Sequence, residues 1–222
     1  MKIIGHIETD FKEKFGIPRQ SGLVKESKGR IVFEKQYNVA EAFRGLEDFS
    51  HIWVLWQFSK AVRESWSPTV RPPLLGGNRR MGVFATRSPF RPNNIGLSAL
   101  KLDRVEITEK EGVVLYVSGA DLMNGTPIYD IKPYLPYADS IPDAVGGFTE
   151  ALEERRLEVD FPDGLLNAVA EEKRDSLVAV LAADPRPSYQ NDPERVYGMS
   201  FAEYEVKFKV DGKSLRVTEV NN

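Results

Sequence analysis

The sequence predicts a mainly β protein, with an antiparallel β-barrel domain over residues 1–150 and a small α+β domain over residues 151–222. Short apolar and aromatic segments alternate with loop-like segments, and few patterns are helical, which favours an antiparallel barrel. The chain has no glycine-rich dinucleotide fingerprint and no P-loop motif, so a doubly wound parallel sheet is not expected. After about Glu150 the pattern changes to helical spacing followed by a hairpin, which indicates the second domain.

The first 150 residues are expected to supply the barrel strands. His51–Phe58 is rich in β-branched and aromatic residues, which is typical of a central, buried strand. Ile128–Tyr137 is expected to be a short edge segment, because Pro133 and Pro136 cannot donate to a ladder. The other expected strands are Lys2–Thr9, Ile31–Phe33, Met81–Thr86, Ile95–Ile107 and Gly112–Ser118, of which the last two pair with each other.

Helical patterns are few. Asn38 is expected to cap a helix that ends near Gly45, because Glu41 follows Asn38 at the spacing of a capping pair. The second domain is expected to contain an amphipathic helix around Leu165–Ala170 and a hairpin over Tyr204–Val217 that turns at Asp211–Gly212.

The composition limits the classes of function. The chain has 222 residues, of which 41% are hydrophobic and 28% charged, as in ordinary globular proteins. It contains no cysteine, which excludes disulfides, thiolate nucleophiles and cysteine-based zinc sites. It has no apolar run long enough for a bilayer and no export signal. We therefore expect a cytoplasmic protein with no membrane partner.

The charge is unevenly distributed along the chain. The net charge is −3, but the segment Ser65–Leu102 contains no Asp or Glu. The cations of this acid-free segment are Arg71, Arg79, Arg80, Arg87, Arg91 and Lys101. A basic stretch inside an acidic protein favours binding of a polyanion such as RNA. The alternative is an exposed cationic face without a partner.

Three polar loops at expected strand ends are the best candidates for a site. The two histidines, His6 and His51, have no metal-ligand spacing, so no metal is expected. The loops combine proline, which fixes the backbone, with glycine, which allows close approach, and with arginine and asparagine as hydrogen-bonding groups. They are Pro18–Gln20, Arg87–Gly96 and Asp121–Pro127. Together they fit a nucleoside that carries a carboxylate or phosphate; the alternative is that they are only tight turns.

These loops resemble those of the TrmO/TsaA-like (YaeB) family of tRNA methyltransferases. The central motif is Gly82–Asn93, which reads Gly-Val-Phe-Ala-Thr-Arg-Ser-Pro-Phe-Arg-Pro-Asn. The other segments that resemble the family are Phe15–Gln20, Ser50–Val54, Asp121–Pro127, Asp130–Tyr134, Asp184–Pro187 and Tyr197–Met199. The resemblance spans nearly the whole chain. It implies a β-barrel methyltransferase that works as a homodimer and uses S-adenosylmethionine to methylate N6 of threonylcarbamoyladenosine at position 37 of tRNA.

The resemblance also implies which residues contact the cofactor. They are Pro18, Arg19, Gln20, Phe58, Ser59, Arg87, Leu97, Asp121, Leu122, Met123 and Asn124. The family has a histidine after the aromatic strand end, where this sequence has Ser59. We expect Arg87 to bind the carboxylate of the cofactor, and Asp121 or the nearby backbone to bind its amine or ribose.

Methyl transfer needs no protein nucleophile, because the sulfonium already activates the carbon, so positioning supplies most of the rate. The acceptor nitrogen must lose a proton, and the unranked candidates to accept it are Asp121, Tyr129, Asp130 and Asp184. The candidates to bind the substrate are Arg91 and Arg186 for the threonyl carboxylate, and Tyr189 for stacking in the anticodon loop.

Two other functions stay open. One is a non-catalytic module that senses S-adenosylmethionine or RNA, and the other is methyl transfer to a small acceptor. A steep loss of affinity with salt would distinguish an RNA enzyme from a small-molecule enzyme. Turnover would distinguish an enzyme from a binding module.

Overall fold

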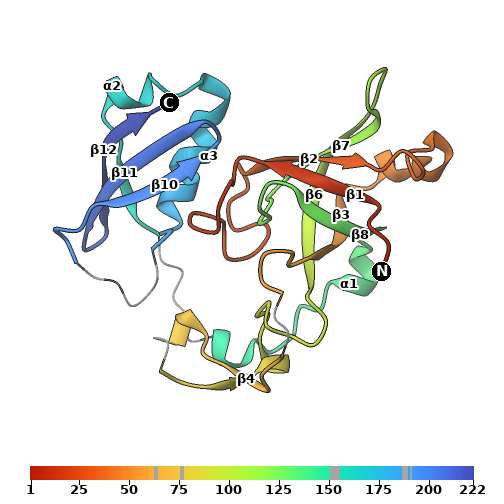
Figure 1. Ribbon diagram of the computed structural model, residues 1–222, viewed down its shortest axis with the longest axis horizontal. Helices are drawn as coiled ribbons and strands as arrows, with labels where there is room; N and C mark the ends of the chain where they lie inside the picture. Colours follow the sequence, from red (N-terminus) through yellow and green to blue (C-terminus); the bar gives the residue numbers. More distant parts are fainter. Residues whose placement is uncertain (63–64, 76–77, 151–155, 187–189, 191) are drawn as a thin grey trace.

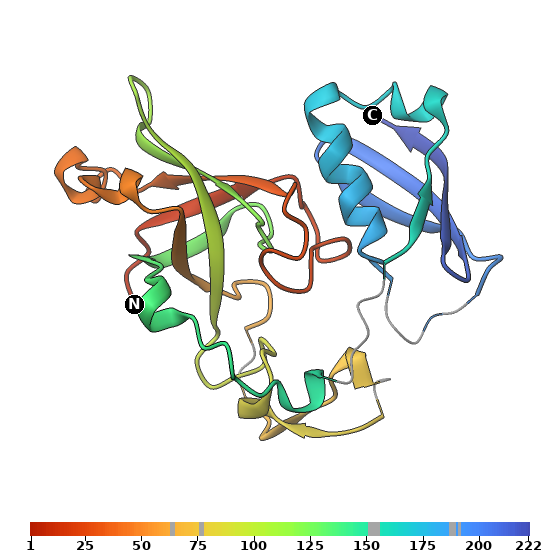
Figure 2. The same ribbon diagram turned by 180° about the vertical axis from the view of Figure 1, so that it is seen from behind.

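The computed structural model describes residues 1–222 except 63–64, 76–77, 151–155, 187–189 and 191. It contains a closed six-stranded barrel, a separate four-stranded sheet and a two-stranded ladder. Figures 1 and 2 show the barrel and the four-stranded sheet side by side. The prediction of a mainly β protein with an antiparallel barrel is therefore confirmed.

The barrel strands follow each other around the closed sheet in the order β1-β2-β7-β6-β3-β8. All neighbours are antiparallel. The strands are β1 (Gly5–Thr9), β2 (Lys28–Phe33), β3 (His51–Gln57), β6 (Ile95–Thr108), β7 (Gly112–Ser118) and β8 (Thr126–Pro133). Strand β3 shows why the barrel closes around a core: its alternate residues Ile52, Val54 and Trp56 are buried inside it. The predicted strand at His51–Phe58 is confirmed, as is the β6–β7 pair.

The prediction that Ile128–Tyr137 lies at an edge is wrong. Strand β8 pairs with β1 on one side and with β3 on the other, because a closed barrel has no edge strand. Pro133 is the last residue of β8, and Pro136 starts the short helix α1 (Pro136–Asp139). Proline in the first turn of a helix costs no hydrogen bond, which is how the chain accommodates Pro136.

Two other expected elements differ from the structure. Asn38 caps no helix: its side chain accepts from the N–H of Val113 (2.7 Å) and donates to the carbonyl of Glu111 (2.6 Å), which holds the β6–β7 turn. The segment after it forms only the 3-10 helix η1 (Ala40–Phe43). The expected strand Met81–Thr86 is limited to β5 (Met81–Gly82), because the 3-10 helix η4 (Val83–Ala85) follows. The remaining short elements are η2 (Leu46–Asp48), β4 (Thr69–Val70), η3 (Pro73–Leu75) and η5 (Gly147–Thr149).

The second sheet has the order β10-β11-β12-β9 and packs against helix α3. Its strands are β9 (Glu158–Asp160), β10 (Tyr197–Phe201), β11 (Tyr204–Asp211) and β12 (Ser214–Asn221). The predicted hairpin is confirmed, with Gly212 in the left-handed region (φ 56°) at its turn. The expected helix around Leu165–Ala170 is limited to α2 (Asp163–Leu166), and Ala170 precedes a second helix, α3 (Glu171–Ala182).

The loop after β1 joins the two sheets. Phe11 and Val24, at its two ends, are buried in the core under the second sheet. Gly16 lies so close to Met199 of β10 that a Cβ atom would come within 2.3 Å of the sulfur. The second core therefore includes side chains from the first 24 residues. The boundary between residues 150 and 151 adjoins the undescribed segment 151–155 and stays a prediction.

Candidate active site

Segments that are far apart in the sequence meet at one end of the barrel. The loop after β1 contacts the segment after β7, where the Gly22 N–H donates to the carbonyl of Gly119 (3.0 Å). The end of β3 contacts the start of β6, where the Phe58 N–H donates to the carbonyl of Asn94 (2.9 Å). The loop after β1 also reaches β6, because the Ala99 N–H donates to Ser21 Oγ (3.2 Å). The fold thus brings the three predicted polar loops together.

Asp121 lies where these segments meet. Its Oδ1 accepts a hydrogen bond from Ser98 Oγ (2.6 Å), which in turn accepts one from Trp56 Nε1 (3.0 Å). Ser98 is fully buried on β6, opposite Val54 of β3, and Trp56 is buried on β3. The barrel interior therefore fixes one oxygen of the Asp121 carboxyl group through two buried side chains.

The pKa of Asp121 is raised. Burial removes water from the carboxylate and raises the pKa of Asp121 from 3.8 to about 6. The Ser98 hydroxyl, the N–H groups of Asp121 and Ser21 and the positive charge of Arg87 act in the opposite direction. Asp121 consequently exchanges its proton within the range in which a general base is effective near neutral pH.

Arg87 and Gln20 complete a polar cluster with Asp121. Arg87 Nη1 donates to Gln20 Oε1 (2.5 Å), and the charge of Arg87 acts on Asp121. Arg87 is exposed, so its remaining donors face solvent. The cluster offers a guanidinium, an amide and a carboxyl group at one place, a combination that suits a zwitterionic amino-acid group.

An aromatic pair lies beside this cluster at the end of β3. The rings of Trp56 and Phe58 have their centroids 4.2 Å apart, with 58° between their planes. Gly96 of β6 is packed against the indole, since a Cβ atom there would lie 2.3 Å from Trp56 Cε2. Leu97, the next residue, is 48% exposed because its side chain points to the other face of the strand.

Several predicted cofactor residues already make contacts within the fold. Leu122 is buried in the barrel core. Asn124 Oδ1 accepts from the Thr9 N–H (3.1 Å), and the carbonyl of Met123 accepts from the hydroxyl of Thr126 (2.6 Å). Any contact from Leu122 or from the Asn124 oxygen to a ligand would therefore have to involve the main chain or break an existing bond. Pro18 is buried, and Ser59 is exposed at the end of β3.

Asp184, Arg186 and Arg19 lie together, at the junction of the two sheets. Arg186 binds Asp184 through two hydrogen bonds, Nε to Oδ1 (2.8 Å) and Nη2 to Oδ2 (3.1 Å), and both side chains are buried. The hydrogen bond to Asp184 raises the pKa of Arg186. Arg19 Nη2 donates to the carbonyls of Asp184 (3.4 Å) and Arg186 (3.3 Å). Asp184 and Arg186 are thus bound to each other, next to the loop that carries Gln20.

The remaining candidate residues make other contacts or lie outside the described residues. Tyr129 is the extra residue of a bulge in β8, between the pairs Leu55–Asp130 and Trp56–Ile128, and Asp130 forms an ion pair with Lys132 (3.0 Å). Arg91 Nη1 donates to the carbonyls of Thr86 (2.6 Å) and Val83 (3.4 Å). Tyr189 lies outside the described residues.

Sequence reasoning missed Ser98, Ser21 and Trp56. Ser98 could have been found from the sequence. It is a hydroxyl residue at an inward-facing position of β6, where the other inward-facing residues include Leu100 and Leu102. Ser21 could not have been found in this way, because its contact with Ala99 joins residues from two distant segments.

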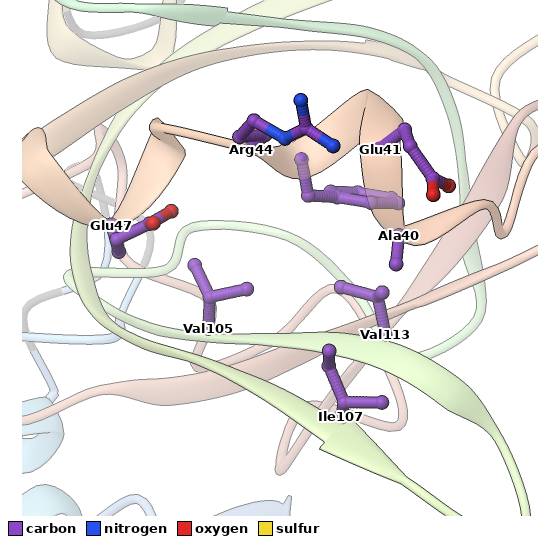
Figure 3. Close-up of a pocket in the computed structure, with 8 residues that line it drawn as sticks. Ala40, Glu41, Arg44, Glu47, Val105, Ile107 and Val113 are labelled. Atoms are coloured by element: carbon purple, nitrogen blue, oxygen red, sulfur yellow. The ribbon is translucent and has the colours of Figure 1, made fainter.

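A cavity beside the barrel lies away from this cluster. This cavity of about 420 Å³ is lined by apolar residues of η1 and the β6–β7 hairpin, with charged groups at its rim. Figure 3 shows Glu41, Arg44 and Glu47 at one side of it and Val105, Ile107 and Val113 at the other. Ile107 is nine residues beyond Ser98 on β6, roughly 30 Å along an extended strand. None of the candidate site residues lines this cavity.

The described residues include no group of three or more His, Asp or Glu arranged to hold a metal ion. Among the same residues no helix has the length and the apolar character that crossing a membrane requires.

Family models cover both parts of the chain. The model of the tRNA-methyltransferase O N-terminal domain matches residues 6–140, and that of the TrmO C-terminal domain matches residues 154–222. The chain belongs to the TrmO family. The Asp121 cluster therefore lies within the N-terminal TrmO region, and the Asp184–Arg186 pair lies within the C-terminal one.

Relatives of known name are found in bacteria and mammals. A tRNA (adenine(37)-N6)-methyltransferase of Escherichia coli (strain K12) is 43% identical over 222 residues, 96% of this chain and 94% of that protein. The protein of the same name from Eikenella corrodens is 51% identical over 73% of this chain and 92% of its own length. The crystal structure of TrmO from Pseudomonas aeruginosa superposes with a TM-score of 0.79 at 32% identity, covering 99% of this chain and 97% of that one.

Proposed function

We propose that this TrmO family member transfers the methyl group of S-adenosylmethionine to N6 of adenine 37 in tRNA, and that its acceptor is the threonylcarbamoylated adenosine. The observation that carries this proposal is the meeting of Gln20, Arg87 and Asp121 beside an aromatic pair at one barrel end. Two relatives, which match 96% and 73% of this chain, are named tRNA (adenine(37)-N6)-methyltransferases. The sensor and small-acceptor alternatives have no comparable support.

The residues present fit this cofactor. The guanidinium of Arg87 suits the carboxylate of its amino-acid group, and the main-chain carbonyls of the Asp121 segment suit its amine. The ring of Phe58, which is partly exposed beside Trp56, suits the face of a flat base. When bound, the cofactor supplies a methyl carbon activated by a sulfonium.

The chain itself orients the reactants and accepts a proton. Of the three carboxylates among the candidate bases, Asp184 is paired with Arg186 and Asp130 with Lys132, whereas Asp121 lies in the cluster with Gln20 and Arg87. We assign proton acceptance to Asp121, because its raised pKa leaves a carboxylate at neutral pH that still takes up a proton readily. The Ser98 hydroxyl holds one oxygen of this carboxyl group in place.

Arg91 is our candidate for the threonyl carboxylate. In the part of the chain that the structure describes, its bonds go to main-chain carbonyls and to no carboxylate, so its charge is not neutralised. The charge of Arg186 is neutralised by Asp184. A cation without a carboxylate partner gains more from binding a substrate carboxylate than one that must first give up its own.

A homodimer is also part of this proposal. Tyr137, Ile141 and Val145 are 86%, 65% and 82% exposed, and so much apolar surface in one short segment is unusual for a monomer. Sedimentation of the purified protein, compared with Ile141→Glu, tests this: a shift to the mass of one chain supports an interface here, and an unchanged mass contradicts it.

The reaction is tested with labelled cofactor. Methyl-labelled S-adenosylmethionine is incubated with tRNA from cells that lack this protein, with and without the threonylcarbamoyl group. Label should enter only the modified tRNA, and Arg87→Ala should abolish it. Arg104→Ala is the matched control, because Arg104 is an exposed arginine in the C-terminal half of β6, where it forms an ion pair with Glu106. Cofactor binding without label in either tRNA would refute the proposal.

A further inference from the structure

Two exposed aromatic side chains lie outside both cores. Trp66 is 51% exposed and Phe84 is 73% exposed, and their ring centroids are 6.2 Å apart with 33° between the planes. Figures 1 and 2 show the segment that contains β4 at the lower edge of the molecule, away from the two larger sheets. Neighbouring aromatic faces in contact with water gain free energy when a flat apolar partner covers them.

The aromatic pair is held in place by the backbone around it. The Val83 N–H donates to the carbonyl of Pro68 (2.9 Å), next to the β4–β5 ladder. The guanidinium of Arg91 lies 5.8 Å from the centroid of the Phe84 ring while it binds the carbonyl of Thr86. Phe84 is therefore fixed on a short, hydrogen-bonded turn, and a partner need not order it first.

Several arginines belong to the same segment as the aromatic pair. Arg87 is three residues after Phe84 in the chain, and its positive charge acts on Asp121 in the proposed active site. Arg80 Nη1 donates to Thr69 Oγ1 of β4 (3.0 Å). Arg71 is the residue directly after β4, the strand that pairs with β5. The whole segment from Ser65 to Leu102 contains no Asp or Glu. Phe84 thus lies between Arg80 and Arg87 in the chain, and the guanidinium of Arg91 lies against its ring.

We propose that Trp66 and Phe84 form a platform on which unpaired bases of the anticodon loop stack, next to the adenine that enters the Asp121 site. Arg80 and Arg71 bind the phosphates of the same strand. This inference rests on the proposed function and adds the surface that holds the RNA. Base stacking on aromatic rings combined with cations along the strand is how proteins hold single-stranded nucleic acid. An apolar protein partner would have no need of the flanking cations.

Binding of a synthetic anticodon stem-loop RNA measures the effect. Trp66→Ala and Phe84→Ala should each weaken RNA binding roughly 10-fold, the order expected for loss of one stacked base. Phe84→Tyr should retain the affinity, because a phenol ring still stacks. Arg80→Gln should weaken binding and reduce its dependence on salt. Ile107→Ala is the matched control, because Ile107 is 72% exposed but lies at the distant β6–β7 turn.

Three further readouts separate the outcomes. S-adenosylmethionine affinity should be unchanged in Trp66→Ala and Phe84→Ala, which would show that the cofactor site is intact. If both variants bind RNA as tightly as the unchanged protein, the inference is overturned. A change of sedimentation mass in either variant would also overturn it, because the surface would then form contacts between copies of the chain. If the unchanged protein methylates tRNA but the two variants bind RNA normally, only the stacking platform is refuted. If the unchanged protein neither binds nor methylates tRNA, the platform and the proposed function are both refuted.

Discussion

At the scale of single residues, Asp121 should make both stability and activity depend on pH. Its pKa is higher in the folded chain (about 6) than its ordinary value of 3.8, so the folded state holds the proton more tightly. The free energy of unfolding therefore falls as pH rises from about 4 to 6. Above pH 6 the loss of unfolding free energy is complete and amounts to at most about 3 kcal/mol. Proton acceptance requires the carboxylate of the folded chain, so activity should rise as pH passes through about 6.

Asp121→Asn tests both expectations. Asn keeps an oxygen for the Ser98 hydroxyl but carries no charge, so the variant should unfold at higher urea concentration than the unchanged protein at pH 7.5 and at a similar one at pH 4. Its kcat should fall with little change in the dissociation constant of S-adenosylmethionine. A weaker cofactor affinity with unchanged kcat would show instead that Asp121 holds the amine.

The sequence allowed part of this cluster to be predicted. Gln20, Arg87 and Asp121 lie in motifs with proline or glycine nearby, and such motifs indicate a site through their residue types and spacing. The mutual pairing of Asp184 and Arg186 could not be read in the same way, because two polar residues at this spacing are as consistent with exposed loop positions as with a buried ion pair. Burial, which decides between these, depends on the whole chain.

At the scale of elements, the start of β6 should tolerate no side chain at Gly96. Gly96→Ala would bring a methyl group to 2.3 Å from the Trp56 indole, so the ring would have to move and its hydrogen bond to Ser98 would be lost. We expect a loss of roughly 1–3 kcal/mol of unfolding free energy and weaker cofactor binding, because Ser98 holds Asp121. Urea unfolding and calorimetric titration with S-adenosylmethionine measure the two effects.

Gly198→Ala is the matched control for this change. Gly198 also lies in a strand, β10, and no atom lies within 4 Å of its added Cβ. This variant should change neither unfolding nor cofactor binding. Equal stability of Gly96→Ala and Gly198→Ala would show that the indole moves freely and does not position Ser98.

Alternation and turn residues predicted the elements that depend on local sequence. The β6–β7 pair and the β11–β12 hairpin follow from them, because both pairings join neighbouring segments. The pairing of β8 with both β1 and β3 joins segments more than 70 residues apart, so prolines alone gave a wrong edge assignment. The prediction that Asn38 caps a helix was wrong for a related reason. The backbone groups that its side chain binds belong to a turn 73 residues away.

At the scale of the whole molecule, the second sheet should help to set the affinity for the cofactor. The loop after β1 carries Gln20 to Arg87 in the proposed active site, while Phe11 and Val24 at its ends are buried in the second core. Lys173 of α3 also binds Asp10 at the start of this loop (Nζ–Oδ1 2.5 Å). The position of Gln20 therefore depends on contacts that lie outside the barrel.

The Asp184–Arg186 pair is the sharpest place to test this dependence. Asp184→Asn keeps a residue that tolerates the left-handed backbone at this position (φ 52°), but it leaves the buried charge of Arg186 without a counter-charge. Such a change costs about 3–5 kcal/mol of unfolding free energy. It should also weaken cofactor binding, because Arg19 donates to the two carbonyls that this pair holds in place.

A double-mutant cycle distinguishes this structural role from catalysis. In Asp184→Asn/Arg186→Gln no charge is left buried, so its loss of unfolding free energy should be smaller than the sum of the two single losses. Arg19→Gln should weaken cofactor binding with little loss of stability, because Arg19 is exposed. If Asp184 were the proton acceptor, Asp184→Asn would lower kcat at unchanged stability and cofactor affinity, and the role assigned to Asp121 would then belong to Asp184.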